Sequence, residues 1–227
     1  MSDLPESPFN ALPPAVWALV IVITGIELLF QVGSYGIIGG PNAVGWRIHA
    51  METYTFFDVI FEEMMLKNYW PFEHAQRFFT YAFVHASMVH ALMVAVFVLA
   101  FGKMVGERFG NIAVIALFVV STLAGSLAYG LILDSSRPLV GGYPAAFGFL
   151  GAYTFLLWVG LGAMGKNAFT AFRLIGFLVA IRLIFAIFNG LPPDLVADIA
   201  GFAAGFVLAA AMVPGAIPRL FQRIRQR

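Results

Sequence analysis

Residues 77–110 read RFFTYAFVHASMVHALMVAVFVLAFGKMVGERFG. The stretch from Phe78 to Phe101 contains no Asp, Glu, Lys or Arg. A helix that crosses a bilayer needs about 20 predominantly apolar residues, and this stretch is long enough. It therefore predicts a membrane-spanning helix.

Further runs of the same kind occur on both sides of this stretch, bounded by Gly, Pro or charged residues. They are Ala15–Ile38, Ile112–Leu133, Ala145–Met164, Phe169–Phe188 and Leu195–Val213. None alternates apolar and polar residues as a strand of a membrane barrel does. The sequence therefore predicts an all-α polytopic membrane protein with six transmembrane helices.

The composition agrees with this class and excludes several others. Apolar residues make up 61% of the chain and charged residues 11%, which is incompatible with a soluble globular domain. A net charge of +1 gives no electrostatic footprint for nucleic acid. The absence of cysteine excludes disulfides, thiolate metal sites and a cysteine nucleophile.

The spans divide the chain into three parts. We expect a cytoplasmic N-terminal tail at 1–14, a six-helix membrane domain at 15–213 and a basic cytoplasmic C-terminal tail at 214–227. Lys and Arg on the inner side, including those of the terminal RLFQRIRQR, favour a cytoplasmic position for both termini. We expect the membrane to be a bacterial inner membrane. The loop at 39–76 interleaves aromatic and charged residues, which is typical of an interfacial, partly membrane-inserted segment.

Three motifs lie in order on different spans. The first is TYAF, which ends at Phe83, followed by His85 and His90. The second, GGYPAAFG, ends at Gly148, and the third is ADIAGFAAGF at 197–206. Together they resemble the rhomboid family of intramembrane serine proteases, which implies a rhomboid-like bundle of six helices.

The resemblance implies a serine at the start of the fourth span and a histidine on the sixth. Polar groups of the second span would stabilise the oxyanion. This sequence departs from the pattern at each point. Tyr143 stands at the serine position and Pro144 at the following glycine, Asp198 stands at the histidine position, and Val94 stands at an asparagine position. Of the usual oxyanion groups, only His85 remains.

These replacements predict a pseudoprotease. A phenol is protonated at neutral pH and an aspartate is a weak base, so Tyr143 and Asp198 do not make an activated nucleophile. Pro144 also lacks the N–H that could donate to an oxyanion.

A charged residue within a membrane span is normally paired. We expect Asp198 to accept a hydrogen bond from Tyr143 and to have Arg182 as its counter-charge, so that these residues plug the former site. Alternatively, Asp198 lies hydrated at a water-filled mouth. Glu27, in the first span, contacts a client helix or extends to the interface.

The remaining candidate residues have structural interpretations. Gly201 and Gly205 permit close helix contact, with Gly148 and Gly151 opposite, although such spacing also occurs in dimerisation motifs. On a continuous helix His85 and His90 would point about 140° apart, so no metal site and no cofactor are expected.

We therefore expect a non-catalytic protein that binds transmembrane helices of other membrane proteins and stabilises or assembles them. The alternative is a stoichiometric accessory subunit of a larger bacterial membrane complex, and the third hypothesis is a residual intramembrane protease. The expected partners are membrane helices and the lipid bilayer, with no nucleic acid and no metal.

Overall fold

The computed structural model describes residues 12–213, so residues 1–11 of the predicted N-terminal tail and the whole predicted C-terminal tail at 214–227 lie outside this range. It contains six helical segments that are long and apolar enough to cross a membrane, which confirms the predicted six-span, all-α fold. They are α1 (Pro14–Ser34), α6 (Met88–Phe109), α7 (Asn111–Ile132), α8 (Tyr143–Ala163), α9 (Arg173–Asn189, preceded by the 3₁₀ helix η3 at Ala168–Phe172) and α10 (Asp194–Met212).

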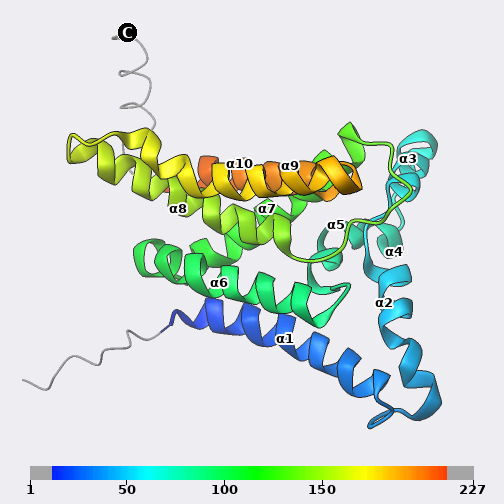
Figure 1. Ribbon diagram of the computed structural model, residues 1–227. Coiled ribbons are helices and arrows are strands. Elements are labelled where there is room, and N and C mark those ends of the chain that lie inside the picture. Colours follow the sequence, from blue (N-terminus) through cyan, green and yellow to red (C-terminus); the bar gives the residue numbers. More distant parts are fainter. Residues whose placement is uncertain (1–11, 214–227) are drawn as a thin grey trace, which may run out of the picture.

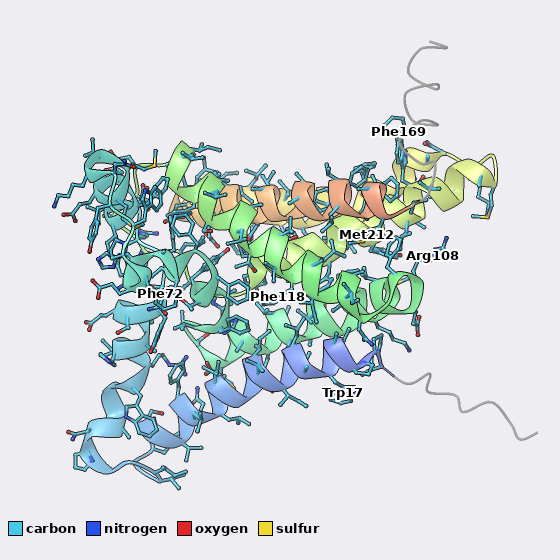
Figure 2. The ribbon with its side chains drawn as sticks, turned by 180° about the vertical axis from the view of Figure 1, so that it is seen from behind. Trp17, Phe72, Arg108, Phe118, Phe169 and Met212 are labelled. Carbon is cyan, nitrogen blue, oxygen red and sulfur yellow. The ribbon has the colours of Figure 1, made fainter. Side chains whose placement is uncertain are left out.

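The spans form a bundle in which α7 connects two groups of helices (Figure 1). Helix α1 packs on α6, α8 packs on α10, and α7 contacts members of both groups. Phe118 of α7 is 1% exposed and lies inside the bundle, whereas Trp17 of α1 is 49% exposed and points away from it (Figure 2). The core therefore lies between the spans, and the outward apolar side chains face lipid.

Glycines bring α8 and α10 into backbone contact. A Cβ atom on Gly205 would lie 1.9 Å from the carbonyl oxygen of Gly148, and one on Gly201 would lie 2.1 Å from that of Pro144. A Cβ on Gly151 would lie 2.1 Å from the carbonyl oxygen of Phe202. These glycines thus line an internal contact between two spans of the same chain.

The long loop after α1 is organised into short helices. They are η1 (Gly40–Gly45), α2 (Trp46–Tyr54), α3 (Asp58–Lys67), α4 (Phe72–Ala75), α5 (Arg77–Thr80) and η2 (Tyr81–Phe83). Large apolar side chains of this loop are exposed, among them Leu66 at 87% and Phe72 at 82%. Such exposure suits a segment at the membrane interface.

The second span differs from its predicted position. The apolar run predicted a helix at Phe78–Phe101, but α6 begins at Met88 and ends at Phe109. The chain is extended at Ser87, whose Oγ accepts a hydrogen bond from the N–H of His90 and caps the helix. The hydroxyl of Ser126 in α7 donates to the carbonyl of Phe78, which holds the preceding turns against α7. The mainly apolar residues from Phe78 to Ser87 are therefore part of the packed bundle, but they do not continue the helix α6.

Candidate functional site

Two glycines set the start of α8. Gly141 has a φ of +86°, which favours glycine, and a Cβ atom there would lie 2.4 Å from His90 Nε2. Its N–H donates to the carbonyl of Tyr81 at 2.9 Å, and the N–H of Gly142 donates to His85 Nε2 at 3.3 Å. The first turn of α8 is therefore fixed against the segment that precedes α6.

His85 is a buried, neutral acceptor in this arrangement. It is 1% exposed, and this burial, with a smaller effect of His90, lowers the pKa of its imidazole from 6.5 to about 4. A hydrogen bond with the backbone of Phe83 acts on this pKa in the opposite direction but does not offset the effect of burial. The helical spacing expected for His85 and His90 is wrong, because His85 precedes α6 and the two ring centroids are only 5.1 Å apart.

Val94 of α6 packs against Gly142, at the start of α8, with an apolar side chain. It is fully buried, and its Cγ1 would lie 2.9 Å from a Cβ on Gly142. The α6 side of the site therefore presents His85, His90 and a valine to the start of α8.

Tyr143 lies between an imidazole and a guanidinium. Its ring stacks on that of His90, with centroids 4.8 Å apart, and Arg182 Cζ lies 5.4 Å from its centroid. Within the described residues 12–213, neither carboxylate oxygen of Asp198 accepts a hydrogen bond from Tyr143, so the expected bond is not formed. Arg182 contacts both residues, so Tyr143 and Asp198 are linked through its guanidinium and not by a direct hydrogen bond.

Asp198 is ion-paired at the centre of the site. Its side chain is fully buried, and its Oδ2 lies 2.5 Å from Arg182 Nη1. Arg182 Nη1 is also 3.2 Å from Oδ2 of Asp194, in the first turn of α10. The alternative of a hydrated Asp198 at an open mouth is therefore wrong. The sequence did not indicate Asp194 as a second partner.

Pro144, in the first turn of α8, packs against both α7 and α10. Its Cβ would lie 2.6 Å from a Cβ on Gly125, and its carbonyl faces Gly201. Beside it, the Tyr81 hydroxyl donates to the carbonyl of Thr122 at 2.8 Å. Burial, with the charge of Asp198, raises the pKa of Tyr81 well above its usual value, so this phenol remains protonated.

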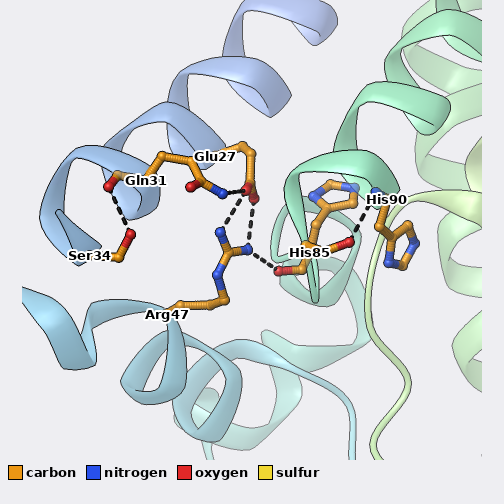
Figure 3. A network of polar contacts seen from close by, with 7 residues as sticks. Glu27, Gln31, Ser34, Arg47, His85 and His90 are labelled. Atoms are coloured by element: carbon orange, nitrogen blue, oxygen red, sulfur yellow. Dashed lines mark hydrogen bonds and ion pairs between the residues drawn. The ribbon is translucent and has the colours of Figure 1, made fainter.

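A second buried ion pair supports the site from the loop (Figure 3). Glu27 of α1 is 1% exposed, and Arg47 of α2 donates to both its carboxylate oxygens, at 2.6 and 2.9 Å. Arg47 Nη1 also donates to the carbonyl of His85 at 2.6 Å, and Gln31 donates to Glu27 at 2.9 Å. The proposed contact of Glu27 with a client or an interface is therefore wrong. No motif or spacing indicated Arg47 as the partner, because it lies in the long loop after α1.

Comparisons with known proteins agree with the fold. The family described as Rhomboid domain matches residues 73–215. The chain is 31% identical over 125 residues to RHOMBOID-like protein 4 of Arabidopsis thaliana. The aligned part covers 55% of this chain but only 31% of that relative. The matched residues include the segment that leads into α6, the start of α8 and the whole of α10. The chain belongs to the rhomboid family.

Proposed function

We propose that this protein is a non-catalytic member of its family that binds transmembrane segments of other membrane proteins. The observation that carries the proposal is the engagement of Asp198 by Arg182, 2.5 Å away, beside the ring of Tyr143. Nucleophilic catalysis needs a hydroxyl within hydrogen-bond reach of a free base. Here the carboxylate of Asp198 forms an ion pair with Arg182, so it is not a free base. The ring of Tyr143 contacts the imidazole of His90 and the guanidinium of Arg182.

The backbone around Tyr143 supports the same interpretation. The N–H of Gly142 is directed at His85 Nε2, and Pro144 has no N–H. An oxyanion site requires donors directed at the position of the developing charge. The two residues that flank Tyr143 therefore offer few such donors.

Helix α9 offers the surface for binding. None of its described side chains is buried, and a Cβ on Gly176 would have no atom within 4 Å. Ala180, one turn later, is also exposed. Small residues four apart on a lipid-facing side allow another helix to approach closely. We propose that client helices contact α9 at Gly176 and Ala180.

We also propose that both termini lie in the cytoplasm of a bacterial cell. Arg108 lies near the end of the bundle at which α1 begins and α10 ends (Figure 2). Lys103 lies earlier in the same helix, Lys166 follows α8, and positive residues favour the cytoplasmic side.

Co-purification tests the binding proposal. We would purify the wild type, Gly176→Leu and the control Gly25→Leu in mild detergent and quantify associated proteins by mass spectrometry. Gly25 matches Gly176 because it also has open space around its Cβ position, but it lies on α1. We expect several membrane proteins to be enriched with the wild type and the control and reduced with Gly176→Leu. Equal enrichment in all three would reject the α9 surface, and one partner at a fixed ratio would instead identify an accessory subunit.

Proteolysis is tested separately in liposomes. The reconstituted wild type should leave a transmembrane substrate intact over the same period as Tyr143→Phe. Cleavage by the wild type that Tyr143→Phe abolishes would overturn the non-catalytic assignment.

A further inference from the structure

Three carboxylates meet at the end of the bundle that carries the long loop. Asp58 is the first residue of α3, Glu62 lies one turn later, and Asp134 follows α7. One oxygen from each lies within 4.8 Å of the other two. The three groups come from segments far apart in the sequence, so only the fold brings them together.

The environment of Asp58 is a second observation that favours a bound cation at this cluster. Asp58 is 2% exposed, and its Oδ2 accepts a hydrogen bond from the N–H of Ser135 at 2.9 Å. Its Oδ1 is buried without a hydrogen-bond partner among the described residues. A buried carboxylate oxygen without a partner is costly, and a bound cation would remove this cost.

Protein cations do not neutralise the cluster. Within residues 12–213, no Lys, Arg or His forms an ion pair with Asp58, Glu62 or Asp134. Glu63, the neighbour of Glu62, is by contrast paired with Lys67. The three clustered carboxylates therefore have no ion-pair partner among the described residues, whereas the adjacent Glu63 has one.

We propose that Asp58, Glu62 and Asp134 bind a divalent cation, for which Ca²⁺ is the best fit. Oxygen ligands lie about 2.3–2.6 Å from Ca²⁺, so two of them on opposite sides are about 4.6–5.2 Å apart. The three carboxylate oxygens all lie within 4.8 Å of one another, so one ion could contact all three. Mg²⁺ prefers about 2.0–2.1 Å and draws its ligands closer together. Glu62 and Asp134 are exposed, which leaves room for entry of the ion and for water ligands.

The bound ion would join the loop to the segment that leads into α8. Phe56, just before α3, exchanges backbone hydrogen bonds with Leu139 at 3.3 and 2.8 Å. Leu139 is two residues before Gly141, which begins the contacts to Tyr81 and His90. The cation would therefore reinforce this attachment beside the candidate site. It would also stabilise the folded state in proportion to its occupancy.

Terbium luminescence tests the site directly. Tb³⁺ replaces Ca²⁺ at oxygen sites and is sensitised by nearby aromatic rings. Tyr129 is well placed for this, since its hydroxyl bonds to Ser135 Oγ at 2.9 Å. The full chain, in phosphatidylcholine nanodiscs and freed of metal with EGTA, would be titrated with Tb³⁺ and then with Ca²⁺ or Mg²⁺. Asp134→Asn and Glu62→Gln remove exposed ligands, and Glu63→Gln is the matched control on the same helix.

We expect Ca²⁺ to displace Tb³⁺ from the wild type and from Glu63→Gln at lower concentration than Mg²⁺. Asp134→Asn and Glu62→Gln should weaken binding by about tenfold or more. Ca²⁺ should also raise the unfolding temperature of the wild type but not that of Asp134→Asn. Equal affinity in all four proteins, or no Ca²⁺-displaceable luminescence in the wild type, would overturn the proposal.

Discussion

Arg182 of α9 lies 2.5 Å from the fully buried carboxylate of Asp198 in α10. The same guanidinium lies 5.4 Å from the ring centroid of Tyr143 and 5.8 Å from that of Phe147. Since no described side chain of α9 is buried, these contacts are a main attachment of this helix to the bundle. A single arginine therefore joins α9, the start of α8 and α10.

The first prediction is that Arg182→Met destabilises the protein more than Asp198→Asn. The methionine leaves a fully buried carboxylate without its cation, which typically costs about 3–5 kcal/mol. The asparagine removes the buried charge and leaves Arg182 paired with Asp194. The free energy of unfolding, measured in detergent by denaturant titration, should show this order.

Two variants check that the effect comes from the ion pair. Arg173→Met removes an exposed arginine from the same helix and should be nearly neutral. The double variant Arg182→Met/Asp198→Leu should recover part of the loss, because it removes both charges. A double variant no more stable than Arg182→Met would contradict the assignment.

The second prediction concerns the α8–α10 contact. Gly205→Ala introduces a Cβ atom 1.9 Å from the carbonyl oxygen of Gly148, so the helices must separate. We expect a loss of about 1–3 kcal/mol or more in the free energy of unfolding. Gly176→Ala is the control, because its Cβ has open space, and alanine in a helix is favoured over glycine by up to about 1 kcal/mol. Similar stabilities for the two variants would show that the contact adjusts without cost.

The sequence could predict the fold because spans and their contacts have local signatures. Apolar runs locate the helices, and glycines at Gly201 and Gly205 mark a close approach. The second span departs from this rule. Hydropathy measures burial, whereas the start of α6 depends on the cap at Ser87, so the helix begins at Met88 and not at Phe78.

The site could be predicted where its residues belong to recognised motifs or, like Arg182, supply the counter-charge that a buried carboxylate needs. Tyr143, Asp198 and Arg182 lie together because their spans are neighbours. The partner of Glu27 could not be found, since Arg47 reaches it from an irregular loop. The proximity of Asp58 and Asp134 could not be predicted either, because the two residues are far apart in the sequence and belong to no common motif. The expectation of no metal rested on histidine and cysteine ligands, whereas the proposed cation site is made of carboxylates.

The third prediction concerns Arg47, whose guanidinium holds both oxygens of Glu27 and the carbonyl of His85. Arg47→Ala leaves the buried Glu27 with only Gln31 and should cost about 3 kcal/mol or more. Arg47→Lys keeps the charge but cannot reproduce the planar fork, so its loss should be intermediate. Unfolding in detergent measures both. Lys67→Met, which breaks the exposed pair with Glu63, should be nearly neutral, and an equal loss there would count against a special role for Arg47.

The fourth prediction is a pH dependence of stability that arises from His85. Its pKa is about 4 in the folded protein and 6.5 as the ordinary value, so the unfolded chain binds the proton more readily. The stabilising contribution is complete above pH 6.5 and decreases as the pH falls towards 4. A protonated imidazole would also lose the Nε2 acceptor for Gly142. We expect this group to account for a loss of at most about 3 kcal/mol.

Because His90, Glu27 and Arg47 also act on His85 electrostatically, the effect must be separated from theirs by a variant. His85→Gln retains an acceptor of similar reach but does not titrate. The free energy of unfolding, measured between pH 7.5 and pH 4 for both proteins, gives the contribution of His85 as the difference between the two curves. That difference should favour the wild type less at pH 4 than at pH 7.5. Parallel curves would mean that protonation of His85 does not oppose folding, and the contact with Gly142 would then hold α8 in place without any sensitivity to pH.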